Sequence, residues 1–299
     1  MDMKKQYLKY VLILSAAIFL ASCKEDGLDP TSVITVDSRE YNEFDEWLEA
    51  NYMEPYNIEF KYRYEMNETN YNYYTIPAEY KFAVQMAHLV KYLCIDTYDE
   101  VAGITFTRSY FPKLFVLMGE WEYLNNGTYI LGTAEGGKKI ILTGINWLPT
   151  YIRTADNLNE YYIKTIHHEF THILNQNVDY PKDFAMVTAD SYLADSWSSE
   201  PYKSSHLKRG FITDYAQESD TEDFAEMLST FVTHDAAWWD SQLLLAGDGA
   251  ASISAKLDIV KAYMQDAFGI NLERVRDVVL RRQNDVMTGL VDLNDLTID

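Results

Sequence analysis

Apolar residues recur along the N-terminal third of this chain with two different periods. Between residues 38 and 54 they repeat at helical spacing, with Ser38 as a candidate cap and Pro55 beyond the end of the predicted helix. From residue 56 to residue 66 apolar and polar residues alternate, which predicts a strand. The helical period then returns and predicts a helix over roughly residues 77–97.

The next segment, residues 111–148, has the pattern of several short strands. An apolar run over residues 111–120 predicts the first of them. The strands that follow are interrupted by Asn-Gly at 126–127 and by Gly-Gly at 136–137, and both dipeptides favour turns. The last predicted strand lies within residues 138–148.

Helical periods dominate the rest of the chain. A helix of about twenty residues is predicted over 158–177, followed by a polar stretch with little period up to residue 220 and a helix over 221–239. Two more helices follow, separated at Gly269. Strands first and helices later predict an α+β fold in one domain over residues 38–299, β-rich to about residue 150 and helical after it.

The first 22 residues have the pattern of a signal peptide. Three lysines precede an uncharged apolar run at 11–20, which is too short to span a bilayer comfortably, and small residues precede Cys23. The tetrapeptide LASC resembles a lipobox, which implies removal of residues 1–22 and lipidation of Cys23. An ordinary secretory signal with an incidental cysteine is the alternative. Residues 23–37 are predicted to be a tether.

The acidic residues Glu25, Asp26 and Asp29 directly follow this cysteine. In some Gram-negative groups such a run resembles a surface-export signal, so we expect an outer-membrane lipoprotein at the cell surface, with the periplasmic face as the alternative. With Cys23 acylated, Cys94 has no partner for a disulfide and is expected to be a small core residue.

Composition narrows the classes of partner. The chain has 299 residues, 47% of them hydrophobic, which is enough for a sizeable core. Its formal net charge of −21 argues against a nucleic-acid partner, because phosphate binding needs a basic face. The sequence specifies no protein partner.

The candidate chemistry lies in the helix predicted over 158–177. His168 and His172 are four residues apart, so both imidazoles can lie on one face, and Glu169 follows the first of them. This His-Glu-x-x-His pattern is typical of zinc peptidases, with the glutamate as general base. His167 is expected to be a surface residue or to support a ligand. A helix that is merely rich in histidine is the alternative.

A catalytic zinc ion needs a third protein ligand and an open position. Asn175 and Val178 stand where a metzincin would have glycine and histidine, so that option fails. Downstream, Glu222 and Glu226 share one face of a helix. One could bind the ion while the other accepts a hydrogen bond from a ligand histidine. Alternatively, both belong to a solvated helical face.

Two other histidines are rival third ligands. His234 lies eight residues after Glu226 on the same predicted helix, and His206 lies in the irregular stretch.

The segments HHEFTHIL and GFITDYAQESDTEDFAEML together resemble a family of zinc-binding metallopeptidase lipoproteins. Their site also resembles the peptidase domain of lethal-factor-type toxins, and both have gluzincin-type sites. The lipoprotein resemblance extends to EPYNIEFKYRY and NNGTYILGTAEGGKKIIL, whereas the toxin resemblance is confined to the site. The resemblance to the lipoprotein family implies a mixed β-sheet, an active-site helix and a helical C-terminal part.

The same resemblance implies roles for individual residues. Glu222 would be the third ligand, and Glu226 would support a ligand histidine. Tyr215, seven residues before Glu222, would be catalytic, although as one of 24 tyrosines it could simply be a packing residue.

The resulting hypothesis is a lipid-anchored peptidase with one zinc ion, acting on peptides or proteins. Glu169 would take a proton from the attacking water, and Tyr215 would donate a hydrogen bond to the oxyanion. By analogy with such enzymes, the substrate would lie along an edge strand, for which residues 138–148 are the candidate. The alternatives are a non-catalytic zinc-containing lipoprotein of an outer-membrane nutrient-uptake system, or an envelope protein without metal.

Overall fold

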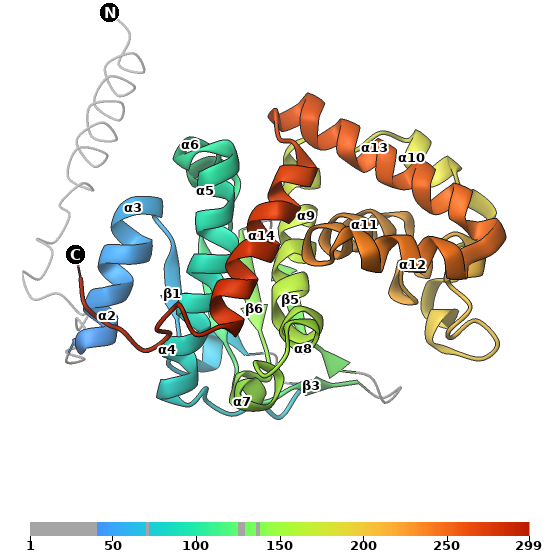
Figure 1. Ribbon diagram of the computed structural model, residues 1–299. Coiled ribbons are helices and arrows are strands. Elements are labelled where there is room, and N and C mark those ends of the chain that lie inside the picture. The colour runs from blue at the N-terminus through green and yellow to red at the C-terminus, as the bar shows by residue number, and fades with distance from the viewer. Residues whose placement is uncertain (1–40, 70–71, 125–128, 136–137, 299) are drawn as a thin grey trace, which may run out of the picture. The chain divides into compact units, whose positions relative to one another are not determined.

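A four-stranded sheet lies among helices that come from both halves of the chain (Figure 1). The computed structural model describes residues 41–69, 72–124, 129–135 and 138–298, and those from 42 onward belong to one unit. The predicted signal peptide, Cys23, the tether and the candidate cap Ser38 lie outside the described residues. So do both predicted turn dipeptides.

The sheet is mixed, as predicted. Its strand order is β1-β2-β6-β5, in which β1, β2 and β6 are parallel and β5 is antiparallel to β6. A separate pair, β3 and β4, is antiparallel. The strands are β1 (Glu59–Lys61), β2 (Leu114–Leu117), β3 (Glu122–Tyr123), β4 (Tyr129–Ile130), β5 (Gly132–Glu135) and β6 (Lys139–Leu142).

The position of β6 corrects the expectation about the edge strand. Residues 138–148 contain β6, which is hydrogen-bonded on one side to β2 and on the other to β5, so both of its edges are occupied. The strand at this edge of the sheet is β5. Order along the chain suggested β6, but the hairpin between β5 and β6 places the earlier strand outside.

Helices occupy more of the N-terminal half than the sequence pattern suggested. Every strand that the structure describes lies before residue 143, yet helices occupy more of the same segment than strands do, so the prediction of a β-rich part to about residue 150 is wrong. These helices are α2 (Glu43–Leu48), η1 (Glu49–Met53), α3 (Glu54–Tyr56), η2 (Met66–Glu68), α4 (Tyr80–Leu89), η3 (Val90–Ile95), α5 (Asp96–Ala102), α6 (Ile104–Tyr110), η4 (Ile145–Trp147) and α7 (Leu148–Tyr151).

Two boundaries in this half differ from prediction. Asn42 caps α2 by accepting a hydrogen bond from Asp45, and the helix continues past Pro55, which lies in the first turn of α3, where its missing N–H costs little. The helix predicted to begin at residue 77 begins at Tyr80, because Pro77 is bridged to Met118 beside the sheet.

The second half is helical, as predicted. It contains α8 (Ala155–Leu158), η5 (Asn159–Ile163), α9 (Lys164–Asn177), α10 (Asp183–Met186), η6 (Ala189–Ser191), η7 (Ala194–Ser198), η8 (Leu207–Arg209), η9 (Tyr215–Gln217), α11 (Asp220–Thr233), α12 (Ala236–Ala246), η10 (Gly247–Gly249), α13 (Ala250–Phe268) and α14 (Leu272–Met287). The helix predicted over 221–239 is two helices, because α11 ends at Thr233 and Asp235 caps α12.

Packing around α9 organises the unit. This helix lies between β5 and α11, and α14 packs against both α11 and α5 (Figure 1). Phe170 of α9 contacts Tyr98, Phe106 and Phe111, so the motif helix is fixed to the N-terminal helices by aromatic rings. Burying such a ring stabilises the fold by about 1.5–3 kcal/mol. Cys94 is buried in the same core, as predicted.

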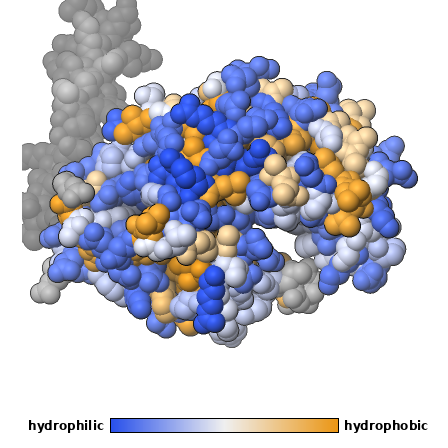
Figure 2. All heavy atoms as spheres, in the orientation of Figure 1, coloured by the Kyte–Doolittle hydropathy of each residue, from blue (hydrophilic) through white to orange (hydrophobic). Residues whose placement is uncertain are grey.

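The face of the molecule drawn in Figure 2 is mostly polar. Figure 2 shows one face on which hydrophilic residues dominate and hydrophobic residues form small separate groups. Among the described residues, no helix combines the length and the apolar character needed to cross a membrane.

Candidate metal centre

Helix α9 has two chemically different faces. Ile166, Phe170 and Leu174 are fully buried and turn one face toward the core. His168 and His172 lie one turn apart on the other face, which borders a cleft. The packing of the apolar face therefore fixes where both imidazoles point.

Helix α11 supplies the facing carboxylates. The Ser219 side chain caps this helix by accepting a hydrogen bond from the backbone N–H of Glu222. Glu222 lies in the first turn, where the helix dipole favours a negative charge, and Glu226 follows one turn later. Because α11 packs along α9, both carboxylates reach the histidines.

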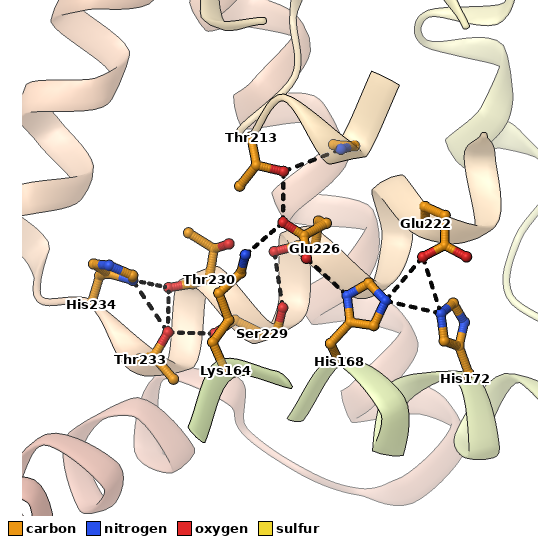
Figure 3. A network of polar contacts seen from close by, with 11 residues as sticks. Lys164, His168, His172, Thr213, Glu222, Glu226, Ser229, Thr230, Thr233 and His234 are labelled. Carbon is orange, nitrogen blue, oxygen red and sulfur yellow. Dashed lines mark hydrogen bonds and ion pairs between the residues drawn. The ribbon is translucent and has the colours of Figure 1, made fainter. Parts of the chain in front are cut away.

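Three side-chain atoms meet at one point of the cleft (Figure 3). His168 Nε2 lies 2.9 Å from Glu222 Oε2 and 3.1 Å from His172 Nε2, and His172 Nε2 lies 3.3 Å from Glu222 Oε2. Ligand atoms about 2.0–2.2 Å from a tetrahedral zinc ion are separated by about 3.3–3.5 Å. The triangle is only slightly tighter than this, so the donor set fits zinc.

Glu226 lies behind His168 and is itself held by two further side chains (Figure 3). One of its carboxylate oxygens is 2.9 Å from His168 Nδ1, as an ion-pair contact rather than a well-aligned hydrogen bond. The other oxygen accepts hydrogen bonds from Lys164 Nζ at 2.7 Å and from Thr213 Oγ1 at 2.6 Å. These contacts orient the ring of His168, so that its Nε2 faces Glu222.

The carboxylates and histidines of the metal centre strongly shift one another's pKa values. Burial lowers the pKa of His168, but Glu222 and Glu226 outweigh it and raise that pKa to about 10. Burial raises the pKa of Glu222, but His168 and His172 lower it to about 2. The pKa of Glu226 is also far below its ordinary value, because Lys164 and His168 outweigh the effect of burial. The site favours positive charge, and a divalent cation would compete with the proton on His168.

Glu169 and Tyr215 border the same cleft, whose volume is about 610 Å³. Glu169 is 8% exposed. The Tyr215 ring stacks on that of His168 at 5.9 Å between centroids, and Trp197 packs edge-on against Tyr215. Burial, followed by the charge of Glu222, raises the pKa of Tyr215 well above its ordinary value, so the hydroxyl keeps its proton.

The edge strand β5 forms part of the wall of the cleft. Gly132 and Thr133 of this strand line it, together with Leu124, Tyr129 and Leu131. A Cβ atom on Gly132 would lie 2.8 Å from Thr165 Cγ2 and 2.9 Å from the carbonyl oxygen of Ile141. Glycine is therefore needed where the strand approaches the motif helix this closely.

The rival histidines lie elsewhere. His206 Nδ1 is 2.8 Å from Asp214 Oδ1, and His234 contacts Thr230 and Thr233 at the far end of α11, away from the three converging side chains (Figure 3). Among the described residues, the one group of side chains placed to hold a metal ion is His168, His172 and Glu222.

The expectation for His167 is corrected. It is fully buried, its Nδ1 lies 3.1 Å from the Tyr98 hydroxyl, and it packs in the core rather than at the surface or against a ligand. Its ring points about 100° away from that of His168, toward Tyr98 in the core, and it does not line the cleft.

Sequence reasoning missed Lys164, Thr213 and Trp197. Lys164 could have been found, because it precedes His168 by four residues and so shares its face. Thr213 and Trp197 lie in stretches without regular period, and no sequence signal brings them to the site.

Comparisons with known proteins agree with this geometry. The sequence pattern of a family described as "Putative zinc-binding metallo-peptidase" matches residues 37–273. Among solved structures, the chain is similar to a protein from Bacteroides caccae described as "a putative zinc-binding metallo-peptidase", with 39% identity and a TM-score of 0.74. The similarity covers 89% of this chain and 100% of the other. A comparison with curated proteins finds no match.

Proposed function

Because the chain belongs to this zinc-binding metallo-peptidase family, we propose that it hydrolyses peptide bonds at the centre formed by His168, His172 and Glu222. The observation that carries the proposal is the convergence of these three donors in a cleft that Glu169 also lines. A structural zinc site has four protein ligands, whereas three ligands leave one position open for catalysis.

Each residue has a role in the proposed reaction. A zinc ion held by the three ligands would supply a Lewis acid that activates water and polarises the scissile carbonyl. Glu169 accepts the proton of the attacking water and passes it to the departing amine as the C–N bond breaks. The protonated hydroxyl of Tyr215 donates a hydrogen bond to the developing oxyanion. Glu226 holds His168 in position.

The proposal includes a lipid anchor at Cys23 and an outer-membrane location. It is supported by the lysines, apolar run and LASC tetrapeptide of the first 23 residues. Growth with a labelled fatty acid should label the wild-type protein and leave Cys23→Ala unlabelled. Equal labelling of both would show that the anchor lies elsewhere.

Glu169→Gln tests the reaction directly. We expect zinc content to stay at that of wild type while cleavage of a peptide library falls by about 10²–10⁴-fold, because the proton acceptor is lost. Zinc is measured by atomic emission and cleavage by mass spectrometry, with and without chelator. Glu54→Gln is the matched control, since Glu54 is exposed and does not line the cleft.

Two results would contradict the proposal. Full activity in Glu169→Gln would show that another group takes the proton. Zinc without cleavage of any peptide by the wild type would favour the non-catalytic binding protein.

A further inference from the structure

A second, smaller hollow adjoins the metal centre, and its lining residues come from outside β5. Its volume is about 390 Å³, and it is lined by His172 and Glu222 together with Asn175, Gln176, Tyr180 and Thr221. The large cleft is lined by the same two ligands. The metal centre therefore lies where the two hollows meet.

The lining of the small hollow is uncharged apart from the ligands. It consists of two amide side chains and two hydroxyl-bearing ones, and the hydroxyl of Tyr180 is already bonded to Asp220. A terminal ammonium or carboxylate group would need an opposite charge there. Amides instead match the neutral peptide groups within a chain.

Asn175 is the residue in this hollow best placed to bind a substrate. It follows His172 by three residues, on the same face of α9. Both polar atoms of its amide are buried and have no hydrogen-bond partner among the described residues. A buried amide without partners is destabilising, and a turn of the side chain into the hollow that Asn175 lines would let a bound peptide provide them.

We propose that the substrate chain crosses the metal centre from the large cleft into the small hollow, where Asn175 binds it, so that internal peptide bonds are cut. This inference rests on the proposed peptidase function. It adds the mode of cleavage and a substrate-binding residue remote from β5.

The experiment uses the zinc-loaded protein and a cleaved peptide identified from a library. The full-length peptide, acetylated and amidated at its ends, is compared with two shortened forms. The first keeps only one residue before the scissile bond. In the second, a chromogenic amine replaces all residues after the scissile bond. The variants are Asn175→Ala, which removes the amide, and Gln176→Trp, which fills the hollow from an exposed position.

We expect the end-blocked peptide to be cut internally. Asn175→Ala should lower its kcat/KM by about tenfold, as for the loss of one hydrogen bond, and Gln176→Trp should lower it by a similar factor because its ring blocks the hollow, while zinc content stays unchanged. One of the two shortened peptides lacks the segment that binds in the small hollow. The variants should cut that peptide as fast as wild type does. Asn177→Trp is the matched control, because Asn177 is exposed on the same helix and does not line the hollow.

Other outcomes separate the two proposals. Cleavage only of peptides with a free terminus would overturn the inference. So would variants that leave all three peptides unaffected or slow them equally. Absence of zinc-dependent cleavage by the wild type would overturn the proposed function and this inference with it. A binding measurement in Glu169→Gln checks the contact without turnover, since adding Asn175→Ala should weaken binding of the full peptide by about tenfold.

Discussion

On each of the two helices of the metal centre, two adjacent ionisable residues have pKa values that are shifted in opposite directions. On α9, His167 faces the core and His168 faces the cleft, and their pKa values lie at about 3 and about 10. On α11, burial raises the pKa of Asp223 to about 7, whereas the pKa of Glu222, next to the histidines, falls to about 2. One step along α9 thus separates a neutral imidazole from a charged one, and one step along α11 separates a carboxylate paired with the histidines from one paired with Lys256.

The comparison shows that burial alone does not decide the protonation of a group. His167 and His168 are both largely buried, but the one polar side-chain partner of the His167 ring among the described residues is the Tyr98 hydroxyl, whereas His168 meets two carboxylates. Low dielectric penalises a charge without a partner and strengthens its attraction to an opposite charge. The cleft face of α9 therefore favours the binding of a cation, whereas its core face does not.

The largest expected effect separates the two histidines of α9. His168→Ala should reduce bound zinc from about one ion per chain to nearly none, because two remaining ligands cannot hold the ion tightly. His167→Phe should keep zinc, since its ring fills a core position. Metal content after dialysis against a weak chelator checks both variants. Equal zinc loss in the two would erase the distinction between the faces.

The next effect is on the stability of the fold and concerns Asp223, the carboxylate of α11 that follows Glu222. Asp223 forms a fully buried ion pair with Lys256 at 2.5 Å and accepts a hydrogen bond from Tyr192. Asp223→Ala leaves the ammonium group without its partner and should lower the free energy of unfolding by about 3–5 kcal/mol. Replacing both members, Asp223→Leu with Lys256→Met, should restore most of it. Denaturant unfolding measures this, and an unchanged midpoint in Asp223→Ala would contradict it.

A smaller effect is expected from the residues that support the cleft face. Lys164→Met removes a hydrogen bond to Glu226 and should weaken zinc binding by about 10–100-fold, because the orientation of His168 is less well fixed. Competition with a fluorescent chelator measures the affinity. Lys208→Met is the control, as Lys208 is exposed on a short helix away from the cleft. Unaltered affinity in Lys164→Met would remove Lys164 from the site.

The smallest effect concerns pH. Folded His167 takes up a proton only near pH 3, but an unfolded histidine does so near 6.5, so between these values unfolding binds a proton and stability falls as pH falls. The contribution is about 1.4 kcal/mol between pH 7.5 and 5.5. His167→Phe should lose that part of the slope when unfolding is followed by circular dichroism at both pH values. Identical slopes would show that the pKa of His167 is the same in the folded and the unfolded protein.

The sequence predicted the parts of this architecture that depend on local spacing. Helical period located α9, α13 and α14, and the separation of His168 from His172 placed both on one face. The α+β class with a mixed sheet and the family were also predicted correctly. These features need only the geometry of one element or a distinctive motif.

The features that were missed depend on contacts between distant segments. Nothing near residue 138 shows that β5 would take the edge instead of β6, since strand order is set by pairing across the sheet. Likewise, Thr213 reaches Glu226 from an irregular stretch whose path is fixed by packing. The distinction between His167 and His168 needed the location of the carboxylates on α11, which periodicity in α9 cannot supply.

The close packing at Gly132 allows a prediction about other sequences that have the same metal-binding residues. A chain with the same histidines and glutamates but a larger residue at the equivalent of position 132 would keep its ligands, since none of them lies on β5. Yet its edge strand would be pushed away from the helix, because the space beside Thr165 and Ile141 is already filled. Such a chain would be expected to bind zinc but to lack the wall that β5 gives the cleft, so under the proposed function this one position would separate peptidases from relatives that only bind the metal.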